Sequence, residues 1–404
     1  MLSAEKQFIL NCLSDYCNHR KTTEPAEQLN YGEVLKLAEE QSMAALIYYQ
    51  CADWMNYGFL DNAFRKAVIQ EGYFSVNRTY LFKELVTYME NKKIPFICMK
   101  GSVFRNLYDI PEIRSMGDID IIVRQEDKEK VNDIFVDDMK FTKFVDNHSV
   151  WTYYLNNIEY EVHNHMFYED LTNDFDYIGF FDHIFEHCKH GTVFDTESNY
   201  LYVPEDNWHF LYLMTHTAKH IINNGSGFRA YIDMVMMAQK CNIDWDWAAE
   251  ELKKMQLLNF TETCFALCEK WFNVKMPLQH KKLDDAFFNE ITEKTFNDGV
   301  FGLENKENEG AHSAKEITRD RKGYWFTAIR LTLKILFPPY NDMILAPWYS
   351  WLKGKPWLLP IAWVYKWFYC ATHKLGYSLK RLAEPFKIRE KIEKRENYIK
   401  DWGL

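Results

Sequence analysis

The chain has 404 residues and a formal net charge of −10, from 48 Lys and Arg against 58 Asp and Glu. This length suits two or three packed units. The acidic balance argues against a long nucleic acid as partner, because such binding needs clustered cations, although a small local basic site is compatible with it. Hydrophobic residues at 47% and aromatic residues at 17% predict globular units with aromatic-rich cores.

Two features bear on the compartment. The nine cysteines are scattered and odd in number, which predicts reduced thiols and a cytoplasmic protein. Residues Met1 to Arg20 carry Glu5, Lys6 and Asp15 among apolar residues, unlike the apolar stretch of a signal peptide.

The first part of the chain, residues 1–92, has apolar residues at helical spacing over Leu29–Tyr49 and Asn62–Asn91. A short apolar strand is predicted at Ile94–Met99. It ends at Lys100-Gly101-Ser102, where Ser102 is placed to cap a helix over Val103–Tyr108.

Strands dominate the next part of the chain. Aromatic and β-branched content predicts them at four places, with a helix over 126–138 between the first and the second. An Asn156-Asn157 turn joins the last two as a hairpin. The four strands are Ile119–Val123, Phe141–Phe144, Val150–Leu155 and Ile158–His163.

From Asn173 onward the pattern is helical, with helices predicted at Trp208–Ile222, Phe228–Lys240 and Trp245–Met255. A Gly-, Asn- and Glu-rich run at 297–312 predicts a linker or mobile loop. The fold class is therefore α+β, a small mixed β-sheet core flanked by large N- and C-terminal helical regions. The predicted parts are 1–92, 93–168, 169–296, 297–312 and 313–404.

The aromatic segment Pro356–Ala371 contains Pro360 and Lys366 and is shorter than the roughly 20 apolar residues of a membrane-spanning helix. This argues against stable membrane insertion and predicts a buried or surface-docking amphipathic helix. Contact with a membrane surface is a second interpretation, and the role of the segment 356–371 stays open.

Three short motifs carry chemistry. Lys100-Gly101-Ser102 follows a buried strand and precedes a helix, where backbone N–H groups can approach a phosphate, although an ordinary strand–helix turn looks the same. Asp118 and Asp120 alternate along a strand and therefore share one face. Two such carboxylates suit Mg²⁺, which prefers oxygen ligands, but a solvated strand end is the plain alternative.

The third motif is Glu159-Tyr160-Glu161-Val162-His163. Strand alternation puts Glu159, Glu161 and His163 on one face, as it also would in an edge strand with a polar outer face. The order of phosphate turn, acid pair and later acid suits two metals about 3.5–4 Å apart that clamp an in-line displacement.

This combination resembles the bacterial uncharacterised nucleotidyltransferase family, within the DNA polymerase β-type nucleotidyltransferase superfamily. The resemblance covers about residues 93–250. It rests on the segments "CMKGSVFRNLYDIPEIRSMGDIDIIV", "EYEVHNH" and "THTAKHIINNGSGFRAYIDMVM".

The resemblance implies a nucleotidyltransferase core at 93–168 and a helical domain at 169–296 that closes its cleft. It assigns the triphosphate to Gly101 and Ser102. The catalytic and metal-binding acids that it implies are Asp118, Asp120 and Glu161. Glu159 competes with Glu161 for the role of third acid.

Two cations and a helical cluster have open roles. Lys100 and Arg114 lie where they could meet phosphate oxygens, or else form salt bridges. Five further residues could line the cleft: His163, His216, His220, Arg229 and Asp233. The four of them beyond residue 200 could instead form a polar seam between two helices, in which Asp233 pairs with Arg229 or a histidine.

The function expected from these motifs is Mg²⁺- or Mn²⁺-dependent transfer of a nucleoside monophosphate from a nucleoside triphosphate (NTP), with release of pyrophosphate. The acceptor stays open between a small molecule, a sugar, a peptide and a protein. The alternative is a catalytically weak nucleotide-binding or antitoxin-like interaction module.

Overall fold

The structure is a computed structural model, and it describes residues 2–26, 28–55, 59–146, 149–168, 171, 173–223, 225–279, 282–299, 324–344, 347–373, 376, 378–379, 381–382 and 397–404. The chain divides into two compact units, residues 1–304 with 402–404, and residues 305–401. The predicted linker 297–312 lies outside the described residues from residue 300 on. The finer division of the first unit stays a prediction.

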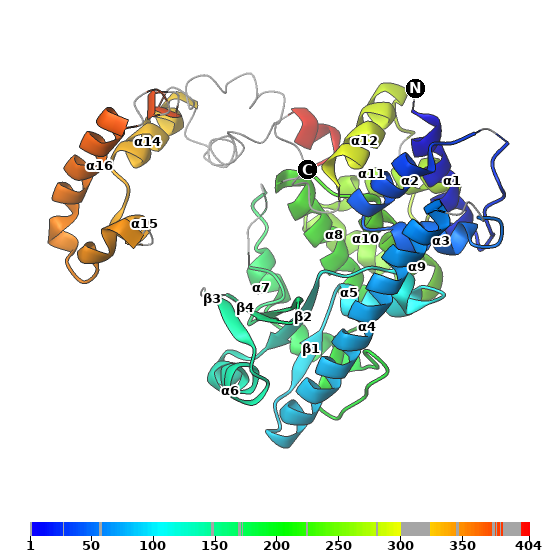
Figure 1. Ribbon diagram of the computed structural model, residues 1–404, viewed down its shortest axis with the longest axis horizontal. Coiled ribbons are helices and arrows are strands. Elements are labelled where there is room, and N and C mark those ends of the chain that lie inside the picture. Colours follow the sequence, from blue (N-terminus) through cyan, green and yellow to red (C-terminus); the bar gives the residue numbers. More distant parts are fainter. Residues whose placement is uncertain are drawn as a thin grey trace. The chain divides into compact units, whose positions relative to one another are not determined.

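Helices form the N-terminal part of the first unit, as predicted (Figure 1). The side chains of Ser3 and Asn30 begin two of them by accepting hydrogen bonds from the backbone N–H groups of Lys6 and Glu33. The four helices are α1 (Ala4–Cys17), α2 (Tyr31–Glu40), α3 (Ala44–Cys51) and α4 (Phe59–Asn91).

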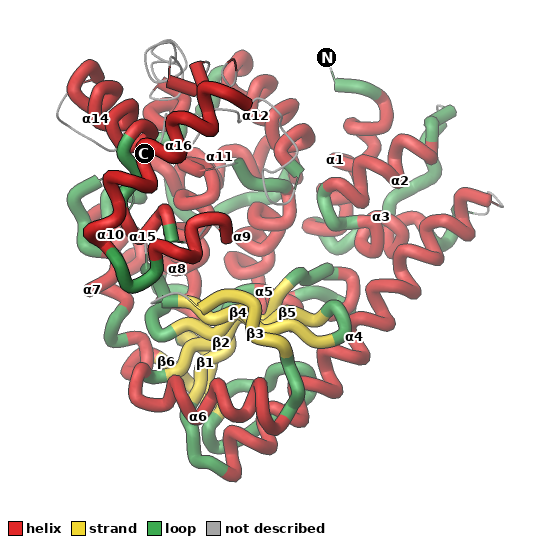
Figure 2. Tube along the Cα trace, turned by 60° about the vertical axis from the view of Figure 1, so that its left-hand side comes forward, coloured by secondary structure: helices red, strands yellow, loops and turns green. Residues whose placement is uncertain are grey.

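A seven-stranded mixed sheet follows, in the order β3-β4-β5-β2-β1-β7-β6, and the α+β fold class is confirmed (Figure 2). Strand β2 pairs in parallel with β5 and antiparallel with β1. The strands are β1 (Phe96–Cys98), β2 (Asp118–Val123), β3 (Thr142–Asp146), β4 (Val150–Leu155), β5 (Ile158–His163), β6 (Cys188–His190) and β7 (Leu201–Pro204).

Strands β6 and β7 correct the expectation that the chain beyond Asn173 is helical. Strand β7 pairs in parallel with β1, and β6 adds an antiparallel edge. Both strands are only three or four residues long, so they depend on pairing with the sheet.

The hairpin between β4 and β5 is confirmed. Asn156 and Asn157 have φ of 53° and 62°, the left-handed pair that a two-residue type I′ turn requires. Asparagine tolerates this conformation better than most residues do.

The two faces of the sheet differ in character. Alternate residues such as Ile119, Ile121 and Tyr160 point to one face, where they pack on α4 residues such as Phe82 and on Phe135 of the segment after α6 (Lys128–Asp133). Strand alternation therefore turns Asp118, Asp120, Glu159, Glu161 and His163 to the other face.

Further helices complete the first unit. The last residues of the chain return to it, because Trp402 is 1% exposed and its ring lies 5.8 Å from that of Phe260. These helices are α5 (Gly101–Phe104), α7 (Tyr177–Phe181), α8 (Asp206–Asn223), α9 (Phe228–Lys240), α10 (Trp245–Lys254), α11 (Leu258–Phe272) and α12 (Asp285–Asp298).

The second unit contains α14 (Tyr324–Leu336), α15 (Tyr340–Met343) and α16 (Leu359–His373). A small core of Met343, Tyr349, Leu352 and Ala362 holds these helices together. Within the described residues, no helix is both long and apolar enough to cross a membrane.

Candidate active site

The acids of the site are aligned by the register of β2 and β5. Asp120 lies directly opposite Glu161, and Asp118 lies opposite Glu159. Ligand atoms of Asp120, Glu161 and His163 all lie within 4.8 Å of one another, so this group could hold a metal ion. Asp118 shares their face two residues before Asp120, whereas Glu159 bonds with the hydroxyl of Tyr154.

Lys100 supplies the positive charge next to these acids. Its Nζ lies 2.6 Å from Oδ1 of Asp120, and its backbone N–H donates to Nε2 of His209 at 3.2 Å. Burial acts to lower the pKa of Lys100, but the carboxylates of Asp120, Asp118 and Glu161 outweigh it and hold the pKa well above its usual value. The ammonium group is therefore charged.

His163 bridges the two acids that face each other. Its Nε2 lies 3.0 Å from Oδ1 of Asp120 and 3.4 Å from Oε2 of Glu161. Burial acts to lower the pKa of His163, but these two carboxylates raise it above its ordinary value. The imidazole thus adds a second positive group beside Asp120 when it is protonated.

The pKa values of the two aspartates are shifted in opposite directions. Burial would raise the pKa of Asp120, yet Lys100 and His163 lower it to about 2. Burial and the neighbouring Asp120 charge raise the pKa of Asp118 to about 6. A divalent cation between the two carboxylates would relieve the repulsion at Asp118, and their oxygens are the ligands that Mg²⁺ prefers. The residues present therefore fit such an ion.

The turn before α5 has an open backbone. Lys100 has φ of 55° in this turn, and within the described residues no partner accepts from the N–H groups of Gly101 and Ser102. The predicted capping role of Ser102 is wrong, because its hydroxyl is buried and donates back to the carbonyl of Met99 at 2.8 Å.

Arg114 forms a salt bridge. Its Nε and Nη2 donate to the two carboxylate oxygens of Asp233 at 2.8 and 2.6 Å, and Tyr108 donates to the same carboxylate. The remaining Nη1 lies 2.8 Å from where a Cβ on residue 101 would stand, so Gly101 leaves room for it. Asp233 thus pairs with Arg114, and the predicted pairing with Arg229 or a histidine is wrong.

One face of α8 is turned toward the acids. Lys100 and His163 act electrostatically on His216, whose Nε2 lies 2.9 Å from that of His220. Burial raises the pKa of the Tyr212 hydroxyl, and the nearby charges of Lys100 and Asp120 shift this pKa down and up, respectively. His209 and Tyr212 were not among the residues predicted for the site. Their spacing from His216 on a single helix, at 209, 212 and 216, is the signal that could have found them.

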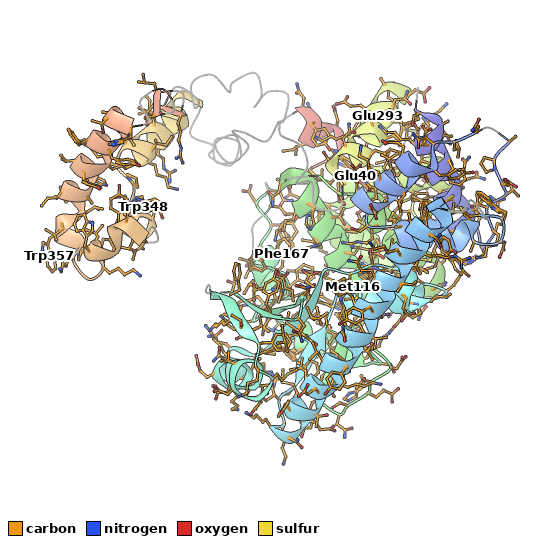
Figure 3. The ribbon with its side chains drawn as sticks, in the orientation of Figure 1. Glu40, Met116, Phe167, Glu293, Trp348 and Trp357 are labelled. Atoms are coloured by element: carbon orange, nitrogen blue, oxygen red, sulfur yellow. The ribbon has the colours of Figure 1, made fainter. Side chains whose placement is uncertain are left out.

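A cavity of about 310 Å³ lies beside the segment that leads into β2. Arg229 donates to the carbonyl of Ser115 at 3.1 Å on its wall, and Gly117 directly precedes Asp118. Figure 3 labels Met116, another residue of its wall. Its other lining residues are Glu39, Ser42, Ala44, Ala45, Ala67, Gln70, Glu71 and Phe74.

The α+β fold and the grouping of Asp120, Glu161 and His163 can be set beside a comparison with known proteins. A family model described as uncharacterised nucleotidyltransferase matches residues 27–273, more than half of the chain, and the chain belongs to this family. No curated protein and no solved structure matches it.

Proposed function

We propose that this protein transfers a nucleoside monophosphate from an NTP to an acceptor and releases pyrophosphate. The observation that carries the proposal is the pairing of Asp120 with Glu161 across β2 and β5, with Asp118 on the same face. The family match supports the class of reaction. The acceptor is a small molecule, sugar, peptide or protein.

The acids would hold divalent cations in this reaction. Asp118 and Asp120 would ligate both ions, and Glu161 would complete the site next to the attacking group. When bound, Mg²⁺ or Mn²⁺ neutralises phosphate charge and lowers the pKa of the attacking hydroxyl.

The reaction itself is an in-line displacement. The acceptor oxygen forms a bond with the α-phosphorus, and the bond from that phosphorus to the oxygen bridging it to the β-phosphorus breaks. The acceptor proton passes to Glu161 or to solvent, and the electron pair leaves with pyrophosphate. Positioning and electrostatic stabilisation supply most of the rate in such transfers.

The triphosphate would bind at the turn before α5, where the N–H groups of Gly101 and Ser102 have no acceptor among the described residues and could donate to it. The ammonium group of Lys100 donates to the carboxylate of Asp120. If a metal ion bound that carboxylate, the ammonium group would be released to bind a phosphate oxygen. Arg114, fixed by Asp233, would support the turn and present Nη1 beside Gly101.

The cavity next to Gly117 would receive part of a substrate, since the chain passes directly from its wall to Asp118. Its volume of about 310 Å³ is that of a small-molecule pocket. Its wall carries charges of both signs, Arg229 together with Glu39 and Glu71, and so suits a polar group.

The test is pyrophosphate release from each of the four NTPs with Mg²⁺ or Mn²⁺, with cell extract as the source of acceptor. We expect release by the native protein and none by an Asp118→Asn/Asp120→Asn variant. Asp285→Asn is the control for the same type of substitution, because Asp285 begins α12 and its side chain is 88% exposed in its pair with Lys270.

Two outcomes would contradict the proposal. If no NTP is consumed but NTP and metal raise the melting temperature through the same aspartates, the protein is a nucleotide-binding module. If NTP neither reacts nor stabilises the protein, the acid group has no nucleotide function.

A further inference from the structure

The second unit presents apolar side chains outward on α16. Ile361, Val364, Tyr365 and Phe368 are each between 53% and 70% exposed. Their spacing of three, one and three residues places them in one stripe along the helix. This outward face is apolar, the reverse of the pattern of a helix on the surface of a water-soluble domain.

The other side of α16 is already occupied. Ala362 is fully buried in the small core, and the indole N–H groups of Trp363 and Trp367 donate to the carbonyls of Pro338 and Leu336 at 2.9 and 2.7 Å. Helix α16 thus has one face that packs within the unit and a second, exposed apolar face that the packing of the unit does not explain.

A second exposed stripe runs along α14. Phe326, Ile329 and Leu333 are each at least half exposed, at a spacing of three and four residues. Two tryptophans near the start of α16, Trp348 and Trp357, are 67% and 70% exposed and are labelled in Figure 3. Exposed apolar surface on this scale marks a contact surface.

The charges beside these stripes select the partner. Within residues 324–344 and 347–373 there are five Lys and Arg but one acidic residue, Asp342, although the whole chain is acidic. Four of the cations, Arg330, Lys334, Lys353 and Lys355, are exposed. If two copies of this face met, their cations would repel one another. A partner surface that has anionic groups at its boundary with water and an apolar layer beneath them would complement the face.

We propose that this unit docks on the surface of a bilayer that contains anionic phospholipid. Helix α16 would lie in the plane of the headgroup region with its apolar stripe in the acyl boundary. Such in-plane binding combines buried apolar area with attraction of Lys and Arg to the headgroups, and tryptophan favours this boundary. It requires no helix that crosses the membrane.

The test is flotation of the full-length protein with vesicles of phosphatidylcholine, with or without phosphatidylglycerol. We expect the protein to float with the anionic vesicles only, and added salt to weaken binding. Tryptophan emission should shift to the blue and be quenched by lipids brominated near the headgroup.

Variants then locate the contact. Trp357→Ser/Phe368→Ser should lower the partition coefficient about tenfold for each side chain, since each loses apolar burial. Lys353→Glu/Lys355→Glu should lower it roughly fivefold for each lysine. The matched control is Tyr73→Ser/Val76→Ser, which removes side chains 65% and 69% exposed on α4 of the first unit and should leave binding unchanged.

Three results would overturn the proposal. The first is that the native protein stays off anionic vesicles, as it would if the face were covered within the chain. The second is that Trp357→Ser/Phe368→Ser floats as well as the native protein. The third is a native dimer that this variant converts to a monomer, which makes the face a protein interface. Circular dichroism and the melting temperature show that each variant is folded.

Discussion

Lys100 and Asp120, twenty residues apart, form an ion pair of 2.6 Å in which Asp120 is 2% exposed. The pair places a positive charge beside carboxylates that would otherwise repel one another. The ammonium group of Lys100 therefore offsets part of the repulsion among these carboxylates.

Replacing Lys100 with Met should lower the free energy of unfolding in metal-free buffer by about 3 kcal/mol, because Asp120 loses its buried partner. Excess Mn²⁺ should restore part of that loss, since an ion that binds only the folded state stabilises it. Urea titrations with and without the metal measure both effects. Lys130→Met is the control, because Lys130 is 59% exposed in its pair with Asp127 and should contribute less than about 1 kcal/mol. A loss of equal size in both variants would contradict this account.

The two glutamates of β5 should differ in their effect on catalysis. Glu161→Gln removes a carboxylate that faces Asp120 and should lower kcat by roughly 100- to 1000-fold, the range for loss of one electrostatic contact to the transition state. Glu159→Gln should leave kcat within about twofold, because the carboxylate of Glu159 accepts an exposed hydrogen bond from the hydroxyl of Tyr154 on β4. Steady-state pyrophosphate release measures both. A larger effect of Glu159→Gln would make Glu159 the third acid.

The buried pair of Arg114 and Asp233 should behave as a unit. Either Arg114→Met or Asp233→Leu leaves an uncompensated buried charge and should destabilise the protein by about 3–5 kcal/mol. The double variant should lose much less than the sum, because neither charge then remains. A double-mutant cycle by chemical denaturation measures the coupling. Additive losses would show that the two side chains act independently.

His209 should make the protein sensitive to acid. Burial lowers its pKa to about 3 in the folded state, against about 6.5 in an unfolded chain. The unfolded state therefore binds the proton more tightly, and the stability present above pH 6.5 is lost progressively as the pH falls toward 3. At pH 5 this amounts to about 2 kcal/mol.

The variant His209→Gln keeps an acceptor for the N–H of Lys100 but does not titrate. Between pH 7.5 and pH 5 the free energy of unfolding should fall in both proteins, and the fall should be about 2 kcal/mol smaller in the variant than in the native protein. Urea titrations at the two pH values give this difference. An identical pH dependence in both proteins would mean that folding leaves the pKa of His209 at its ordinary value.

Local pattern was sufficient where a segment's own residues determine its structure. The alternation over Ile158–His163 and the Asn156-Asn157 turn predicted a hairpin that the structure contains. Strands β6 and β7 were missed, since pairing with β1, about a hundred residues earlier, holds β7 in the sheet.

The site shows the same division. The alternation in β2 and β5 predicted that their acids share one face, and the register of the two strands agrees with it. Pattern did not provide the partners of Lys100 and Asp233, which are Asp120 and Arg114. These contacts join residues 20 and 119 apart in sequence, and no local rule specifies the register that brings them together.

The chain leaves the first unit after Glu304 and returns to it at Trp402, whose ring packs between those of Phe260 and Phe287. The second unit is therefore an insertion held at both ends rather than a tail. A single proteolytic cut inside it would leave both fragments attached to the first unit, and release would need two cuts.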